Sequence, residues 1–316
     1  MADPEKLSVK EIIAAVLVII LVGVGIFISV GVYTEESKPV DVALSDLGAK
    51  FDDRVEINMR IVSVDPIKGD ANVRLELIPH GKVLDEDGGL AADLKLHVPS
   101  ANGKSEIEFK KGKNLTPVEA VFNLYGNASD YPFDEHAADF YLWLEKPVPE
   151  KKAEPKPAPA VEGDEEKKPE PAAVDESDLN EVPLDVSFFG NIPGYKITAE
   201  RLKSSDEGFV EGLIKVDRSN TVVLFSILIG VLMWGLSLAV LFLVLSLVLR
   251  GRKIEIAMFS FMAALLFAFY SVRGSQPNVP PIGTLFDFIF FFWAEALVAL
   301  CLVLAVFVWV FRTPKA

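Results

Sequence analysis

Four long apolar runs interrupt an otherwise polar chain, one near the N-terminus and three near the C-terminus. They cover residues Glu11–Tyr33, Thr221–Leu249, Ile254–Tyr270 and Leu285–Phe311. A transmembrane helix needs about 20 apolar residues, because it rises about 1.5 Å per residue through a hydrocarbon core about 30 Å thick. The first, second and fourth runs reach that length, and Lys253 and Arg273 can anchor the shorter third run. The pattern predicts an integral membrane protein with four transmembrane helices.

Basic residues beside these runs predict how the chain is oriented. Arg250, Arg252 and Lys253 cluster between the second and third runs, and such clusters favour the cytoplasmic side. The first run has no Ala-x-Ala cleavage site, which favours an uncleaved anchor over a signal peptide. We therefore expect a multi-pass protein of the plasma membrane. Its expected segments are a cytoplasmic N-terminus (1–10), transmembrane helices (11–33, 220–249, 254–272 and 285–311), an extracytoplasmic domain (34–219), an outer hairpin (273–284) and a cytoplasmic tail (312–316).

The outer domain shows apolar and polar residues in alternation. In Val73-Arg74-Leu75-Glu76-Leu77 the odd positions are apolar and the even ones charged, which is typical of a half-buried β-strand. Short strands broken by turns, with no helical stretch between them, predict an all-β antiparallel sandwich. The expected strands are 54–64, 73–77, 93–98, 106–110, 117–125, 137–145, 183–189, 195–201 and 209–216.

Residues 147–181 differ from the rest of this domain. Pro, Ala, Glu and Lys fill the segment, and no aromatic residue occurs in it. Such a composition cannot bury enough surface to offset the entropy of ordering, so we expect a disordered insert. A tolerated surface insertion is favoured over a spacer that reaches toward a cell wall.

Composition narrows the function classes. A net charge of −14 argues against a nucleic-acid partner, which needs a basic footprint. The one cysteine, Cys301, lies in the last run, so the outer domain must fold without disulfides. The three histidines are scattered and lack the ligand spacing of a metal site. No catalytic triad or phosphate-binding loop is recognisable, so we expect no enzyme, no metal and no cofactor.

Two polar features should lie where the outer domain meets the membrane. Tyr131-Pro132-Phe133-Asp134 precedes a predicted strand, and its proline and aspartate favour a structural turn at the base of the sandwich. Arg273 and Asp287 flank a proline-rich outer hairpin. They predict an ion pair that locks the third and fourth helices together. The hairpin is expected to dock the outer domain onto the helices, with contact to lipid headgroups as the alternative.

Glu295 is the polar residue deepest in the last run, eight positions beyond Asp287. A straight helix puts it about 12 Å deeper, and an ionisable group at that depth is a candidate functional site. The interpretation we favour is a carboxyl that fastens helices, through Ser237, Ser260 or a partner protein. Ion or proton transport is the alternative.

These residues together resemble a known family. The N-terminal anchor, the β-rich domain with the Tyr131–Asp134 turn, and three C-terminal helices are similar to domain-of-unknown-function family 4436. The resemblance also rests on Trp234 and on the hairpin residues Arg273, Pro277, Pro280, Pro281, Ile282, Gly283 and Asp287. It covers nearly all of the chain outside residues 147–181. It implies the topology and the fold, and it brings no established activity.

The leading expectation is a non-enzymatic membrane protein that acts as an accessory or interaction subunit of a cell-envelope or transport assembly. Its expected partners are membrane lipids and other membrane or envelope proteins. A channel or proton-linked transporter that uses Glu295 is the alternative. An enzymatic site around Asp134, Arg273 and Asp287 is a third interpretation, which we rank lowest.

Overall fold

The structure is a computed structural model that describes residues 9–45, 50–101, 105–146, 181–202 and 206–312. Within helix α1 (Val9–Glu36) the side chains are described only in part. The predicted disordered insert lies outside the described residues except for Glu181, so that prediction is not addressed by the structure.

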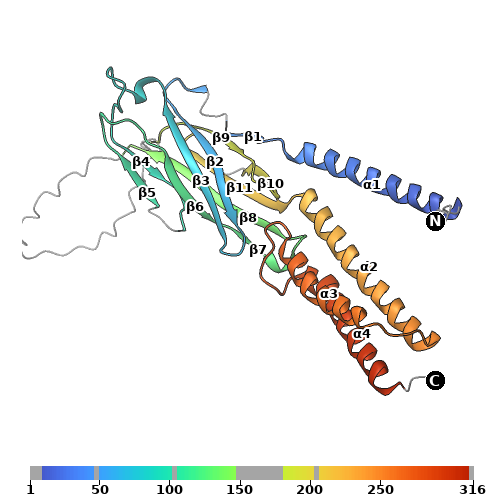
Figure 1. The fold of residues 1–316 in the computed structure, drawn as a ribbon. Coiled ribbons are helices and arrows are strands. Elements are labelled where there is room, and N and C mark those ends of the chain that lie inside the picture. Colours follow the sequence, from blue (N-terminus) through green and yellow to red (C-terminus); the bar gives the residue numbers. More distant parts are fainter. Residues whose placement is uncertain (1–8, 46–49, 102–104, 147–180, 203–205, 313–316) are drawn as a thin grey trace, which may run out of the picture.

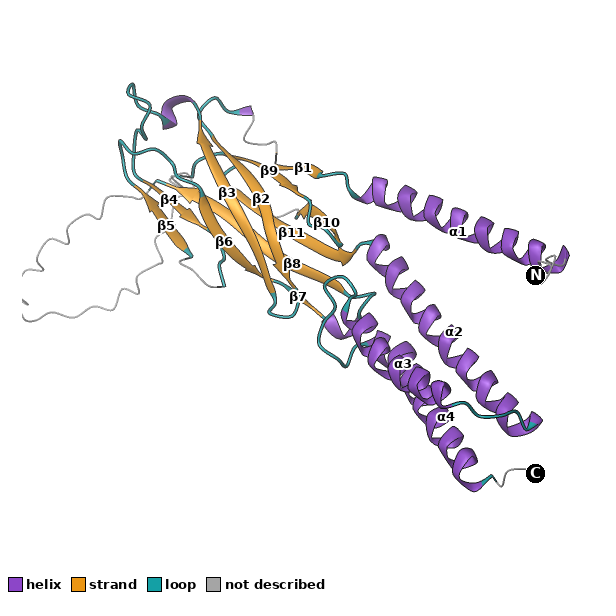
Figure 2. Cartoon of the chain, in the orientation of Figure 1, coloured by secondary structure: helices purple, strands orange, loops and turns teal. Residues whose placement is uncertain are grey.

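Two β-sheets form the outer domain (Figure 1, Figure 2). The first has the strand order β1-β9-β2-β3-β6, and the second has the order β10-β11-β8-β4-β5, with the short β7 paired to β8. All nine predicted strands are present. The strands are β1 (Val40–Ser45), β2 (Val55–Asp65), β3 (Asp70–Pro79), β4 (Leu94–His97), β5 (Glu106–Phe109), β6 (Val118–Asn123), β7 (Tyr125–Gly126), β8 (Glu135–Glu145), β9 (Leu184–Gly190), β10 (Tyr195–Arg201) and β11 (Phe209–Arg218). Short 3-10 turns lie at Gly81–Val83 and Ala128–Asp130.

The expectation of a purely antiparallel sandwich is wrong at one strand pair. β9 runs parallel to β2, with Val55 opposite Leu184 and Arg60 opposite Phe189. β9 follows β8 of the other sheet in the chain, and it enters beside the first residues of β2. Alternation of apolar and polar residues reports which face is buried, not the direction of the strand. The sequence pattern therefore could not reveal the parallel pair.

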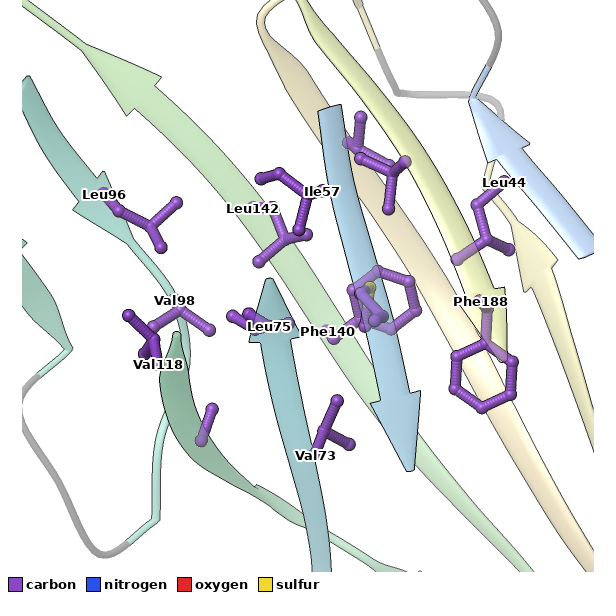
Figure 3. Close-up of a cluster of buried hydrophobic side chains, with 14 of the residues drawn as sticks. Leu44, Ile57, Val73, Leu75, Leu96, Val98, Val118, Phe140, Leu142 and Phe188 are labelled. Atoms are coloured by element: carbon purple, nitrogen blue, oxygen red, sulfur yellow. The ribbon is translucent and has the colours of Figure 1, made fainter. Parts of the chain in front are cut away.

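The core lies between the sheets (Figure 3). Val73 and Leu75 of the first sheet face Phe140 and Leu142 of the second, and all four side chains are buried. Burial of each such side chain contributes about 1.5–3 kcal/mol. The period-two pattern read from the sequence is thus the pattern of side chains that fill this core.

Three helices are long and apolar enough to cross a membrane: α2 (Asn220–Arg250), α3 (Ile256–Gly274) and the segment Asp287–Phe311. The last segment begins with a π-helical turn, η5 (Asp287–Phe291), and continues as α4 (Phe292–Phe311). These helices pack against one another through a buried apolar cluster. They indicate a membrane protein.

The predicted four-helix bundle is corrected to a three-helix bundle. α1 is a helix of 28 residues, but it is not among the three spans found in the described residues. It stands apart from the bundle in Figure 1, and its described apolar side chains, such as Ile20, Val24 and Phe27, are exposed. α1 leads into β1 at the edge of one sheet, whereas α2 directly continues β11 of the other. The two helices therefore leave the sandwich from different strands.

Candidate functional site at the junction of sheet and helices

The turn before β8 places a buried carboxylate at the base of the sandwich. Asp134 accepts hydrogen bonds from Nε of Arg218, at 2.9 Å to Oδ1 and 3.0 Å to Oδ2. Both side chains are almost fully buried. His136 Nε2 lies 2.9 Å from Oδ2 of the same carboxylate. Burial by itself would raise the pKa of Asp134, but the bonds from His136 and Arg218 outweigh it and lower that pKa.

Arg218 is held between two tyrosine rings. Its guanidinium carbon lies 5.0 Å from the ring centroid of Tyr131 and 4.7 Å from that of Tyr195. Its Nη1 donates to the Tyr195 hydroxyl at 3.0 Å. Burial raises the pKa of both tyrosines, so both phenols stay neutral at physiological pH. The Arg218 guanidinium is therefore enclosed by one carboxylate and two aromatic faces. These contacts hold the end of β11 in one position at the base of the sandwich.

Tyr131 connects this cluster to the helices. Its hydroxyl lies 3.0 Å from Oγ of Ser226 in α2 and donates to the Pro277 carbonyl oxygen at 3.3 Å. Its own carbonyl oxygen accepts from the Phe286 amide at 3.2 Å. One buried residue thus joins the sandwich to α2 and the outer hairpin through its side chain, and to the segment before η5 through its backbone. Phe133 of the same turn is 53% exposed, so of the two aromatics only Tyr131 inserts beneath the sandwich edge.

The predicted ion pair between Arg273 and Asp287 is present. Nε and Nη2 of Arg273 lie 2.8 Å and 2.7 Å from the two carboxylate oxygens, a bidentate arrangement with both side chains buried. The arginine also donates to the carbonyl oxygens of Pro280 and Pro281, at 2.9 Å and 3.3 Å. One side chain therefore closes the hairpin and joins the end of α3 to the start of η5.

Asp287 also organises the backbone just before its own helix. Its Oδ2 accepts from the amides of Gly283 and Thr284, at 2.8 Å and 3.0 Å, and from the Thr284 hydroxyl at 3.0 Å. Gly283 has a φ of 124°, a backbone conformation that favours glycine. The hairpin residues singled out from the sequence are thus brought together. Most of their polar groups are bonded within the hairpin or to Tyr131, which suits a structural connector better than a catalytic centre. The side-chain amide of Gln276, in the same hairpin, is buried with no hydrogen-bond partner among the described residues.

Gly230 and Trp234 of α2 hold the π-helical turn η5 close to that helix. The ring of Phe290 lies against Gly230, where an added Cβ would meet the ring at 2.5 Å. One turn further, the Trp234 indole N–H donates to the Ile289 carbonyl oxygen at 3.2 Å. This carbonyl belongs to the π-helical turn, where the regular α-helical bonding pattern is interrupted. Trp234 therefore stabilises an irregular turn that faces α2.

Glu295 does not make the contacts expected for it. It is half-buried, and among the described residues no hydrogen bond joins it to Ser237 or Ser260. The Ser237 hydroxyl instead donates to the carbonyl oxygens of Met233 and Ala294, each at 2.9 Å, and Ser260 is exposed. The polar contact between α2 and α4 is made by Ser237 itself. Glu295 remains a candidate functional residue because of its position within the apolar segment.

Several residues of this junction were missed by sequence reasoning. Arg218, His136, Tyr195 and Ser226 all take part in it, and Glu36 joins the end of α1 to the start of α2 through Thr221. Arg218 could have been found from the sequence, because a basic residue directly before a long apolar run is expected to have an acidic partner nearby. The others are unremarkable in the sequence and gain their roles by folding. Within the described ranges no group of three or more His, Cys, Asp and Glu side chains could hold a metal ion.

Comparison with protein families divides the chain at this junction. Residues 46–217 match the model named Domain of unknown function (DUF4436), and residues 218–312 match the model named Domain of unknown function (DUF8686). No curated protein matches the chain. The hairpin from Arg273 to Asp287 thus lies in the second match, not in the first. The ion pair between Asp134 and Arg218 joins the two matched regions.

Proposed function

The chain belongs to the DUF4436 family, whose model matches more than half of it, and on that premise we propose a non-enzymatic integral membrane protein that presents its β-sandwich to other proteins. It acts as an accessory or interaction subunit of a cell-envelope or transport assembly in the plasma membrane. The observation that carries this proposal is the junction. Buried hydrogen bonds of Tyr131, Asp134 and Arg218 fix the orientation of the sandwich relative to the helices. A rigidly attached domain of this kind is suited to presenting a binding surface to another protein.

The proposed topology follows from charge and exposure. The cluster Arg250, Arg252 and Lys253 lies at the ends of α2 and α3 remote from the sandwich, and basic clusters favour the cytoplasm. The sandwich is then extracytoplasmic, with α1 as an additional anchor. Two exposed aromatic side chains, Phe133 and Tyr270, lie toward the other membrane boundary, and the amphipathic ring of Tyr270 suits the interfacial layer.

Site-directed labelling tests this topology. We place a single cysteine at Lys111 or at Arg252, in a Cys301→Ala background, and add a membrane-impermeant maleimide to intact cells whose wall has been made permeable. Cysteine at position 111 should react at once, and cysteine at position 252 only after lysis. The reverse pattern would invert the topology.

Quantitative co-purification from native membranes tests the interaction role. The wild-type chain should recover the same companion protein repeatedly and in near-stoichiometric amount. The double variant Asp134→Ala and Arg218→Ala weakens the attachment of the sandwich to the helices. It should lose most of the companion protein. The double variant Glu200→Ala and Lys215→Ala removes an exposed ion pair on neighbouring strands and should retain it. Repeated recovery of the wild-type chain alone would count against the proposal.

The alternative, a channel or proton-linked transporter, is favoured by the position of Glu295 within a membrane-length helix. A proton path needs further polar groups at that depth, and the preceding acid of the same segment, Asp287, is paired with Arg273. Flux into proteoliposomes that is abolished by Glu295→Gln would establish transport. Absence of flux with the wild-type chain would remove it.

A further inference from the structure

Two adjoining cavities lie where α1 and α2 leave the sandwich. One has a volume of 410 Å³ and is bounded by the end of α1, the start of α2 and the outer hairpin, including Tyr33, Val222 and Pro277. The other, of 320 Å³, lies between α1 and the sheet edges and includes Lys38, Lys196 and Thr198. Both fall in the range of about 300–1,000 Å³ that ligand sites occupy.

The cavities share Glu36, Asn191 and Tyr195 in their walls, and we call the two together the hollow. Both have mainly apolar walls, with Val222 among the apolar residues beside the helices. The two cavities differ in charge, because Glu36 lines both whereas Lys196 lines only the one beside the sheets. Both signs of charge therefore meet in the cavity on the side of the sandwich.

Below the hollow, the facing helices stay apart. The Glu36 carboxylate accepts from the backbone amide of Asn220 and, at 2.9 Å, from that of Thr221, and it accepts from the Thr221 hydroxyl at 2.6 Å. These bonds join the last turn of α1 to the first turn of α2. From that point the two helices diverge (Figure 1). Apolar side chains on both remain exposed, Phe27 on α1 and Leu228 on α2 among them.

Glu36 keeps a negative charge in this hollow. Burial alone would raise the pKa of Glu36, but the bonds from Thr221 and Asn220 outweigh it and lower that pKa. The positive charge available to a ligand is that of Lys196, because Lys38 lies 2.8 Å from Glu35 and is already paired. Lys196 is exposed and has no ion pair within the described part of the chain.

We propose that this hollow binds one phospholipid whose headgroup carries a primary ammonium. The ammonium lies against Glu36, the phosphate lies within reach of Lys196 and Asn191, and the acyl chains descend between α1 and α2. Charge complementarity favours a zwitterionic headgroup, which matches one carboxylate and one lysine, whereas an anionic headgroup meets the carboxylate unfavourably. A primary ammonium can also donate hydrogen bonds to the carboxylate, which a quaternary ammonium cannot. A transmembrane helix could cover the apolar walls but would leave Lys196 without a counter-charge. The proposal rests on the membrane placement proposed above.

Native mass spectrometry of the full-length chain, released from nanodiscs, tests the proposal. The nanodiscs contain equal amounts of phosphatidylethanolamine, phosphatidylcholine and phosphatidylglycerol. We expect the wild-type chain to retain phosphatidylethanolamine about 1.4- to fivefold above either of the others, as one such charged contact is worth about 0.2–1 kcal/mol.

Two variants separate the charged contacts. Lys196→Glu should abolish the preference, whereas Lys111→Glu, an exposed lysine outside both cavities, should keep it. Glu36→Gln preserves an acceptor but removes the charge, and should remove the preference over phosphatidylcholine. Should Glu36→Gln fail to fold, Lys196→Glu still decides, because it lies on the surface of β10.

Three outcomes would overturn the proposal. They are retention of the three lipids in their bulk ratio, a preference for phosphatidylglycerol, and identical behaviour of Lys196→Glu and Lys111→Glu. A lipid-free dimer cross-linked through cysteine at position 27 would also overturn it, because a second helix would then occupy the gap. Failure of the chain to insert into nanodiscs would instead refute the membrane placement.

Discussion

The three C-terminal helices and α1 are attached to the same sandwich in different ways. α2 and the hairpin are held by Tyr131 and by the buried pair of Asp134 with Arg218. α1 is held mainly by Glu36, a half-buried carboxylate at its very end, and by the Ser37 carbonyl oxygen, which accepts from Asn191 at 2.9 Å. Several buried contacts at separate points fix an orientation, whereas a few solvent-accessible bonds at one point allow the helix to change its angle. The bundle should therefore move with the sandwich, and α1 should be the helix that changes its angle.

The largest effect should come from removing one partner of the buried pair. Asp134→Ala leaves the Arg218 charge buried without compensation, which costs about 3–5 kcal/mol. We expect a marked fall in the midpoint of thermal unfolding in detergent, followed by tryptophan fluorescence. Glu200→Ala breaks the exposed pair with Lys215 and should cost less than about 1 kcal/mol. Equal effects from the two substitutions would show that these buried contacts do not hold the end of β11 in one position.

The second largest effect should appear in the hairpin. Arg273→Ala removes the fork that binds Asp287 and the carbonyl oxygens of Pro280 and Pro281, at a cost of about 3 kcal/mol or more. Hydrogen exchange of residues 275–286 should accelerate strongly. Arg273→Lys keeps the charge but loses the bidentate geometry, so its exchange should be intermediate. Unchanged exchange in both variants would contradict the role of Arg273 as the closure of the hairpin.

A smaller effect should follow from losing one hydroxyl. Tyr131→Phe keeps the ring over Arg218 but removes the bonds to Ser226 and Pro277, for about 1 kcal/mol. Combining it with Ser226→Ala forms a double-mutant cycle, measured by the same unfolding midpoint. A coupling energy near zero would mean that the contact between this hydroxyl and α2 does not stabilise the attachment of the sandwich to the helices.

The smallest effect concerns α1 and depends on pH. The pKa of Glu36 is lowered in the folded protein, so its stabilisation is complete above the pKa of the unfolded chain and is lost as pH falls through the folded value. The contact is half-exposed, and less than about 1 kcal/mol is at stake. Spin labels on α1 and α2 should therefore report a broader distance distribution in acid than at neutral pH. In Glu36→Gln that broadening should already be present at neutral pH and should not change with acid.

Sequence reasoning succeeded where a local pattern has one structural meaning. Alternation in Val73–Leu77 located β3, because only a strand puts every second side chain on one face. The strand β1 was missed although Val40, Val42 and Leu44 alternate, because it immediately follows the end of α1. The pair of Arg273 and Asp287 was predictable, since opposite charges flank a short hairpin between two apolar runs. The partner of Asp134 was not, because 84 residues separate it from Arg218.

The sequence by itself determined that long apolar helices and an alternating β-domain coexist in this chain, because hydrophobic length and period are local properties. Tertiary structure decided the rest: the parallel pairing of β9 with β2, the separation of α1 from the bundle, and the enclosure of Arg218 by Asp134 and two tyrosines. These depend on which distant segments share space. Such contacts draw their strength from burial, and burial exists only once the chain has folded.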